Sequence, residues 1–529
     1  MDAVTTDSAV ASGFGGTDEG AEEAPVTLRE RRLILIAMCV ALMAVISSVS
    51  GLNVAQQALA VDLDASQSQL LWIINGYTLA LAALLMPIGA IGDRWGRKPI
   101  LMLGLIGFAS ASTASAFASS AEVLISLRVA AGFSAAMIMP VTLSVITTTF
   151  PPEERGKAVG IWAGVAGAGG IVGLFVSAAI IDNATWPWVF AFPVALALGS
   201  FVLTWAAVPH SREHSDTRFD VLGSVLSTAA VGGLVLGLQE GPERGWSHPI
   251  AAAGMTIAVV GILLFVIVEM RQDHPLLDVR LFSHRGLATG SVNLFVAFAV
   301  IFAIFLILIQ LLQAVFGYTA LRSASGLLPM AAVMMPLSAI APGLALRFGY
   351  RKTTVIGMLA LAGGTGSLAL FADLDQGYWS ILPGILLLGS GLGLSMSPAT
   401  EAITLSLPTD KQGVASALND TVREIGGAVG IALIASVVNS QYRSNVKDAT
   451  DSLPPELAER VEEGIGGALQ TAAQLGPDGA GLLDAARQAW LDGMRPALWL
   501  AAGLAVAAAA YTALSGPERA ASNNHDVES

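Results

Sequence analysis

The feature that most constrains the fold is a series of fourteen apolar segments that runs through almost the whole chain. Each segment can cross a bilayer, which takes roughly 17 to 25 residues of helix. Because a spanning segment must satisfy its own backbone hydrogen bonds, these segments are expected to be helices. They lie at 33–52, 70–91, 99–119, 123–149, 157–181, 187–208, 219–239, 250–269, 288–315, 324–346, 352–372, 378–404, 413–439 and 495–514. One shifted boundary between 99 and 149 would make the count thirteen or fifteen.

The composition agrees with a polytopic membrane protein. The chain is 54% hydrophobic and 13% charged, whereas soluble domains average about 25% charged residues. Most of the net charge of -13 lies outside the apolar segments, in residues 1–32, 440–494 and 515–529. It therefore indicates solvation and not an acidic binding surface. Residues 1–32 are predicted to be a disordered tail without the basic start of a signal peptide, and 515–529 a second tail.

The positive charges predict the orientation. With fourteen helices and both termini inside, most of the 27 Lys and Arg residues fall in inside loops and tails. The short outside loops hold only Arg244 and Arg322. Since short inside loops are rich in Lys and Arg, both tails are expected to be cytoplasmic.

An internal repeat divides the chain. Arg347-Phe-Gly-Tyr-Arg-Lys352 follows the tenth segment as a partial copy of Arg94-Trp-Gly-Arg-Lys98, which follows the second. Such repeats mark the two halves of transporters. Eight segments separate the copies where a six-plus-six architecture would give six. The predicted domains are therefore a six-helix bundle at 33–208, two inserted helices with flanking loops at 209–286, and a second six-helix bundle at 287–514.

A polar stretch at 440–494 interrupts the second bundle. Leu457, Val461, Ile465, Leu469 and Ala472 recur at helical spacing, and a second candidate helix covers 480–491. This pattern predicts an external helical hairpin, with a mobile linker as the alternative.

The junction at residues 89–98 carries a specific pattern, Gly-x-Ile-Gly-Asp-Arg-x-Gly-Arg-Lys. An ordinary basic loop would explain the three bases but not Asp93 or the glycine spacing. The pattern closely resembles the signature between the second and third helices of the major facilitator superfamily of secondary transporters. We expect a short loop that latches one side of the transporter, formed by Gly89, Asp93, Arg94, Gly96, Arg97 and Lys98.

Charged residues inside the segments are the candidates for proton coupling, because a charge at the bilayer centre costs about 2.5 to 3.5 kcal/mol or more. Counting from Gln412, Asp420 lies about 12 Å deep and Glu424 about 18 Å deep. Asp420 and Glu424 share a helix face, and two carboxylates so close cannot both ionise cheaply. Arg423 can pair with Asp420, which leaves Glu424 to exchange protons. Alternatively, Glu424 only faces a water-filled vestibule. Glu401, nearer the inner end of the twelfth segment, is a weaker candidate.

Arg128 lies in the fourth segment. Its context, Leu-Arg-Val-Ala-Ala-Gly, resembles the superfamily's fourth-helix pattern, in which the arginine is linked to proton coupling. A structural ion pair is the alternative.

A wider resemblance covers nearly the whole chain between its tails. Tyr77-Thr-Leu-Ala80, Phe219-Asp-Val-Leu-Gly223, His274-Pro-Leu-Leu-Asp278 and Gln313-Ala-Val-Phe-Gly-Tyr318 look like the fourteen-helix drug:proton antiporters of the EmrB/QacA type. Membership implies an all-α major facilitator fold in a bacterial inner membrane. It implies export of lipophilic, often cationic, compounds in exchange for protons. Nothing in the pattern implies an enzyme, a cofactor, a metal or a nucleic-acid partner. No phosphate-binding Gly-x-x-x-x-Gly-Lys-Ser/Thr loop occurs, so the proton gradient is the expected energy source.

Two departures bear on the substrate. Ser48 stands where the family's first helix has an aspartate. The fifth segment keeps Gly164, Gly167, Gly170 and Gly173 but lacks the family's proline. These four glycines are expected to line one side of the helix, for close packing or for gating. Candidate cavity residues, each equally able to bond a neighbouring helix, are Ser48, Asn53, Asn75, Tyr77 and Gln313.

Three functions compete. The first is proton-coupled multidrug efflux by alternating access. The second is a dedicated exporter of one metabolite or antibiotic, suggested by Ser48. The third is a non-transporting sensor or scaffold that uses the 440–494 hairpin. The intact Asp93 pattern and Glu424 count against the third function.

Overall fold

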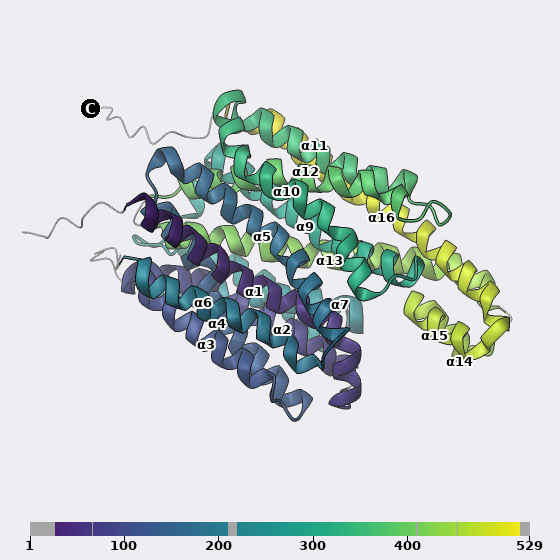
Figure 1. Ribbon diagram of the computed structural model, residues 1–529. Coiled ribbons are helices and arrows are strands. Elements are labelled where there is room, and N and C mark those ends of the chain that lie inside the picture. Colours follow the sequence, from purple (N-terminus) through teal and green to yellow (C-terminus); the bar gives the residue numbers. More distant parts are fainter. Residues whose placement is uncertain (1–26, 66, 210–218, 409–410, 452, 519–529) are drawn as a thin grey trace, which may run out of the picture.

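The computed structural model describes residues 27–65, 67–209, 219–408, 411–451 and 453–518. The described part of the chain is a bundle of long helices (Figure 1). The helices are α1 (Leu28–Asp62), α2 (Gln67–Trp95), α3 (Arg97–Ser115), α4 (Ala121–Thr149), α5 (Pro152–Ile181), α6 (Ala191–Ala207), α7 (Val221–Arg244), α8 (Pro249–Glu269), α9 (Arg285–Gln310), α10 (Ala320–Phe348), α11 (Tyr350–Phe371), α12 (Tyr378–Leu405), α13 (Gln412–Thr450), α14 (Pro455–Glu463), α15 (Ile465–Leu475) and α16 (Ala480–Ser515).

Thirteen of the segments in the described residues are long and apolar enough to cross a membrane. With α3, whose first turn carries Arg97 and Lys98, they give the fourteen predicted helices. The helix ends follow local signals. Thr27 forms a capping box with Glu30 at the start of α1, and Ser120 caps α4.

The internal repeat has a matching backbone. Gly96 separates α2 from α3 with φ of 105°, and Gly349 separates α10 from α11 with φ of 96°. Only glycine adopts such angles without strain, so each copy of the repeat breaks one helix and starts the next within a single residue. The predicted polar loop at 89–98 is therefore wrong in one respect. It is a helix-to-helix junction, because Gly96 turns the chain without additional residues.

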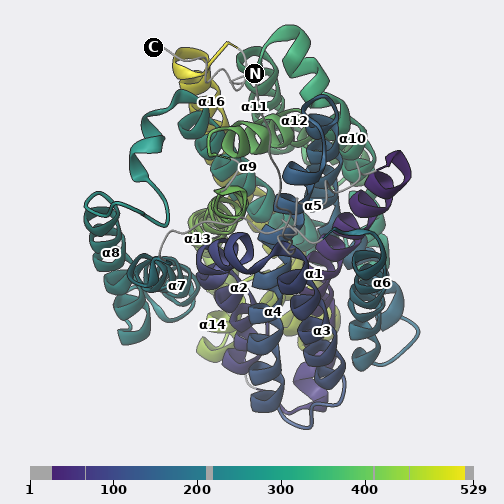
Figure 2. The ribbon, with the colours of Figure 1, turned by 90° about the vertical axis from the view of Figure 1, so that its left-hand side faces the viewer.

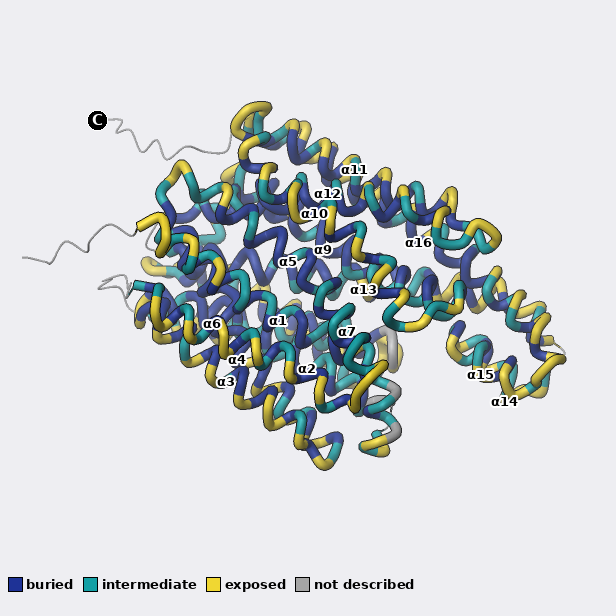
Figure 3. The backbone as a smooth tube through the Cα atoms, viewed as in Figure 1, coloured by how far each residue is buried: buried dark blue, intermediate teal, exposed yellow. Residues whose placement is uncertain are grey.

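The core consists of two large buried clusters. One is formed by residues of α1 to α6, and the other mainly by residues of α9 to α13 and α16. Helices α7 and α8 pack on each other at the side of the bundle, where α7 contacts α2 and α13 (Figure 2). Exposed residues follow the outer surface of the bundle (Figure 3). On α8 they are large and aliphatic, as expected for a helix that faces lipid.

Helix α1 begins and α16 ends at one end of the bundle, which we call the latch end; α14 and α15 lie at the other end (Figure 1).

The segment between α13 and α16 differs from the predicted hairpin at 440–494 in the bounds of its helices. Helix α13 continues to Thr450, and Gly464 interrupts the helical structure between α14 and α15. The helix expected at 480–491 continues into the last segment despite Pro496, because Trp490, Met494 and Leu498 remain buried along one face.

Candidate functional site

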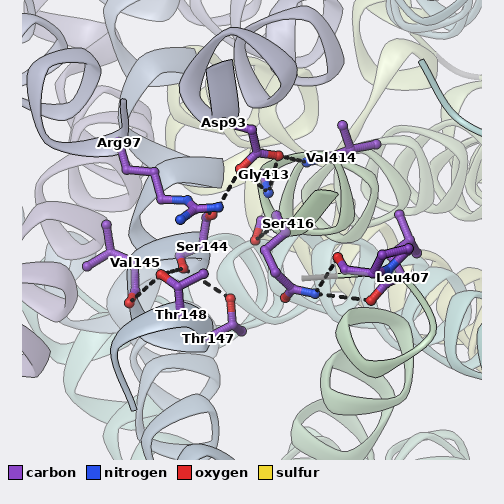
Figure 4. A network of polar contacts seen from close by, with 12 residues as sticks. Asp93, Arg97, Ser144, Val145, Thr147, Thr148, Leu407, Gly413, Val414 and Ser416 are labelled. Atoms are coloured by element: carbon purple, nitrogen blue, oxygen red, sulfur yellow. Dashed lines mark hydrogen bonds and ion pairs between the residues drawn. The ribbon is translucent and has the colours of Figure 1, made fainter. Parts of the chain in front are cut away.

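A carboxylate joins the two halves at the latch end. Asp93, at the end of α2, accepts hydrogen bonds from the backbone N–H groups of Gly413, at 2.9 and 2.7 Å, and Val414, at 3.2 Å (Figure 4). Both N–H groups belong to the first turn of α13, where the N–H groups lack a partner within their own helix. A negative charge is also favoured at a helix N-terminus. Asp93 is thus the cap of a helix that belongs to the other half of the chain.

Arginine fixes the direction of this carboxylate. Arg97 Nη2 lies 2.8 Å from Asp93 Oδ1, and Arg97 Nε donates to Ser144 Oγ of α4 at 2.8 Å. Asp93 and Arg97 are 6% and 2% exposed. We call the set Asp93, Arg97, Ser144 and the Gly413–Val414 backbone the latch. Among the other predicted members, Lys98 Nζ donates to the carbonyls of Trp205 and Val208, whereas Arg94 is exposed.

Glycines make the latch contact possible. A Cβ at Gly413 would lie 2.6 Å from both Asp93 Cγ and Oδ2 and would also meet the Gly89 carbonyl oxygen. A Cβ at Gly89 would lie 2.5 Å from the Gly413 oxygen and 2.6 Å from Ala417 Cβ. Because backbone faces backbone here, no side-chain rotation would relieve either clash. The sequence pattern identified Gly89 but missed Gly413, whose only signal was its position at the start of the thirteenth apolar segment.

A second contact between the halves runs along α5. Ser338 Oγ of α10 donates to the Gly160 carbonyl at 2.9 Å. A Cβ at Gly156 would lie 3.0 Å from Glu401 Oε1 of α12. Glu401 therefore lies at the interface near the latch end. Neither Gly160 nor Ser338 was singled out by the sequence.

The predicted single glycine face of α5 is not present. Gly164 and Gly167 approach Ser338 and Met334 of α10, whereas Gly170 and Gly173 approach Ser50 and Ser47 of α1. The physical reason is the helical period. At 3.6 residues per turn, each three-residue step falls about 60° short of a full turn, so Gly164 and Gly173 point in opposite directions. The glycines allow α5 to pack closely on a helix of each half.

Three charges lie together on α13. Arg423 Nη1 donates to Asp420 Oδ1 at 2.9 Å, as the spacing predicted. Asp420 is fully buried, and the Arg423 guanidinium lies over the rings of Phe298 at 4.5 Å and Trp162 at 5.4 Å. Phe298 belongs to α9 and Trp162 to α5, so aromatic rings of both halves enclose this cation. No sequence pattern pointed to either ring.

Glu424 differs from its neighbours. Its side chain is partly exposed, and among the described residues it makes no hydrogen bond or ion pair. Its carboxyl group is within electrostatic reach of Arg423 and Asp420 on the same helix and of Tyr77 on α2. Thus α13 carries one close ion pair and, one turn from Asp420, a carboxyl group that makes no hydrogen bond or close ion pair in the described structure.

Arg128 occupies a separate polar site in the first half. Its Nη1 donates to Ser48 Oγ at 2.8 Å and its Nε to the Ile73 carbonyl at 3.2 Å. The guanidinium lies 4.2 Å from the centre of the Tyr77 ring, and Tyr77 donates to the Val45 carbonyl. Arg128 is fully buried, and its Nη2 has no hydrogen-bond partner in the described structure. Ser48, which stands where the resemblance implied an aspartate, is therefore a direct partner of this arginine.

The remaining candidates are dispersed. Asn53 is exposed and bonds its own helix at the Val49 carbonyl. Asn75 is partly exposed on α2. Gln313 is partly exposed within a π-helical turn, Leu311–Val315, a distortion often found at functional positions. The contacts do not join these three residues to Arg128 or to the α13 charges.

Sequence comparison relates the chain to known membrane transporters. Residues 36–431 match the Major Facilitator Superfamily. The chain is 34% identical to the multidrug efflux pump LfrA of Mycolicibacterium smegmatis, over 91% of this chain and 95% of that one. It is 31% identical to the tetracenomycin C resistance and export protein of Streptomyces glaucescens, over 93% and 94%.

Solved structures share the fold. The human organic anion transporter MFSD10 has a TM-score of 0.60 at 12% identity, over 92% of this chain and 100% of that one. The proton:xylose symporter XylE also has a TM-score of 0.60, at 13% identity, over 93% and 96%. The predicted all-helical polytopic fold and superfamily are thus confirmed. The chain is a multi-pass membrane protein that belongs to the Major Facilitator Superfamily of transporters.

Proposed function

We propose that the protein is a proton-coupled efflux antiporter of lipophilic, drug-like cations that works by alternating access in a bacterial inner membrane. Both termini and the latch end lie in the cytoplasm in this proposal, in keeping with the distribution of Lys and Arg. Relatives described as multidrug efflux or resistance proteins favour export of small molecules. Protons and membrane lipid are the other partners, and the proton gradient takes the place of a cofactor.

The observation that carries this proposal is the difference between Glu424 and Asp420. Asp420 forms an ion pair with Arg423 at 2.9 Å, so its charge has a partner on the same helix. Glu424 has no such partner among the described residues and retains exposed surface. An acid in a membrane segment is costly unless it has a function or a partner. Glu424 would therefore exchange a proton for the cation.

The latch supplies the conformational half of the mechanism. With Asp93 on the α13 N-terminus, the two halves are joined at the cytoplasmic end, which corresponds to a state closed toward the cytoplasm. For coupling, the proton affinity of Glu424 must differ between the two facing states, because a ligand shifts only an equilibrium in which its affinities differ. Glu424 lies on the helix that Asp93 caps, so movement of α13 would change both sites together.

The test is uptake of ethidium into everted vesicles or proteoliposomes that contain the wild type, with an imposed pH gradient as the only energy source. Uptake that follows the gradient and collapses when a protonophore is added supports the proposal. Folded protein that moves no ethidium under these conditions contradicts the cationic-drug assignment.

A second candidate, a dedicated exporter of one metabolite or antibiotic, is favoured by the contact between Arg128 and Ser48. Among the described residues, no acid makes a hydrogen bond or ion pair with that buried cation, so this part of the site carries a positive charge that repels cations. A screen of neutral, anionic and cationic compounds separates the two functions. Transport of a single compound favours the second candidate, and transport of many unrelated cations favours the first.

A further inference from the structure

Two carboxyl groups meet at the latch end of the α7–α8 pair, away from the site described above. Asp220 caps the start of α7, and Glu269 is the last residue of α8. A Cβ built on Gly223 would collide with both Asp220 Oδ2 and Glu269 Oε1, so these two oxygens lie close to each other on one side of Gly223. Glu269 is only 1% exposed. Two ionised carboxylates in this position would repel each other strongly.

The hydrogen-bond donors are divided unequally between the two groups. Asp220 accepts from the Gly223 N–H at 2.8 Å, from Gln272 Nε2 at 3.2 Å and from the Leu276 N–H at 3.2 Å. Glu269 accepts at Oε2 from the Leu277 N–H at 3.1 Å. Its Oε1 is buried and has no hydrogen-bond partner among the described residues. Three donors stabilise a charge on Asp220, whereas the orphan Oε1 of Glu269 faces an acceptor.

We propose that Asp220 and Glu269 form a second proton-binding site. Glu269 Oε1 carries the proton and donates a hydrogen bond to Asp220 Oδ2. One proton removes the repulsion and satisfies the orphan oxygen at the same time. The proton binds and leaves without any other bond forming or breaking. Its structural effect is to hold the segment 272–277, whose N–H groups bind both carboxyl groups.

This segment leads directly to the latch. Lys411 Nζ donates to the Pro275 carbonyl at 3.0 Å. Lys411 immediately precedes α13, and the Gly413 N–H of that helix donates a hydrogen bond to Asp93. Helix α7 also packs on α2 and α13, the two helices that the latch joins. The proton therefore holds the segment on one side, and Lys411 connects the other side of that segment to the α13 N-terminus.

Protons reach the pair from the aqueous phase at the latch end. A cleft of about 410 Å³ is lined by Asp220 together with Arg271, Asp273 and His274. Lys411, which precedes α13, is within electrostatic reach of Glu269. Arg271 and Lys411 favour loss of the proton, and Asp220 and Asp273 favour its retention. Because the proton is the missing donor, the contact is complete at low pH and is lost as the pH rises.

The test is hydrogen–deuterium exchange of the purified full chain in nanodiscs, without substrate. The measured quantity is the protection of residues 270–278, corrected for the intrinsic pH dependence of exchange. In the wild type we expect protection to fall at least tenfold between about pH 5 and about pH 9, a range that allows for a buried carboxyl group. Glu269→Gln keeps a donor toward Asp220 at every pH, so its protection should stay constant.

Two further variants make the result specific. Asp220→Asn also removes one negative charge and should abolish the pH dependence. Glu240→Gln removes an acid from α7 that pairs with Arg244 at 2.6 Å, and it should follow the wild type. A pH-independent wild type, or a Glu269→Gln variant with the pH dependence of the wild type, would overturn the proposal. Since no substrate is present, neither result depends on the function proposed for Glu424.

Discussion

Replacing Gly413 by alanine should open the latch without altering any charged group. The new Cβ would lie 2.6 Å from Asp93 Cγ and Oδ2 and would meet the Gly89 carbonyl oxygen, so Asp93 must leave the α13 N-terminus. That removes the hydrogen bonds from the Gly413 and Val414 N–H groups. Bonds to a charged group contribute about 1.5 to 3 kcal/mol each, or about 3 to 6 kcal/mol for the two. At about 1.4 kcal/mol per factor of ten, the closed state should lose about 100-fold or more in population relative to the open state.

The assay is the distance between spin labels at Trp95 of α2 and Arg347 of α10, two exposed positions at the latch end, in a Cys39→Ala background. The wild type should give one narrow distance distribution, and Gly413→Ala a shifted or broader one. Gly343→Ala is the matched control, because a Cβ at this α10 glycine meets nothing within 4 Å. A distribution for Gly413→Ala that matches that of Gly343→Ala would refute the steric reasoning.

Three other substitutions have defined outcomes. Asp93→Asn keeps the shape but not the charge of the cap, so it should slow substrate cycling by about 10- to 100-fold while binding is retained; loss of equilibrium binding would show that the latch is not its role. Arg423→Gln leaves Asp420 buried without its partner, a change that costs about 3 to 5 kcal/mol. Its thermal unfolding temperature should fall and be largely restored by the added Asp420→Asn; an unchanged temperature would argue against the pair's importance. Ser48→Asp places an acid beside Arg128 and should lower the KM for ethidium by about tenfold, about 1.4 kcal/mol; an unchanged KM would exclude this position from cation selection.

The membrane-spanning helices could be predicted from the sequence because each one requires a long apolar run of its own. The repeat was accessible because Gly96 and Gly349 stand at the same place in two similar motifs, and both have positive φ. The Asp420–Arg423 pair was accessible because it depends only on the spacing within one helix. These features all depend on local sequence.

Contacts between distant segments were less accessible. Asp93 and Gly413 are 320 positions apart. A glycine at the start of a helix does not indicate which carboxylate caps that helix. The partners of Arg128 and the rings around Arg423 depend in the same way on tertiary packing. The glycines of α5 were misassigned to one face because a three-residue spacing was treated as a full helical turn, although the error reaches half a turn between Gly164 and Gly173.

The most direct test of the account is to compare Glu424→Gln with Glu154→Gln, a partly exposed control on α5 that pairs with Arg31, in proteoliposomes. Two quantities are measured for each: ethidium uptake driven by a pH gradient, and ethidium exchange without a gradient. If Glu424 carries the proton, its variant should lose gradient-driven uptake but retain exchange, while Glu154→Gln behaves as the wild type. Gradient-driven uptake by Glu424→Gln at the wild-type rate would contradict the assignment.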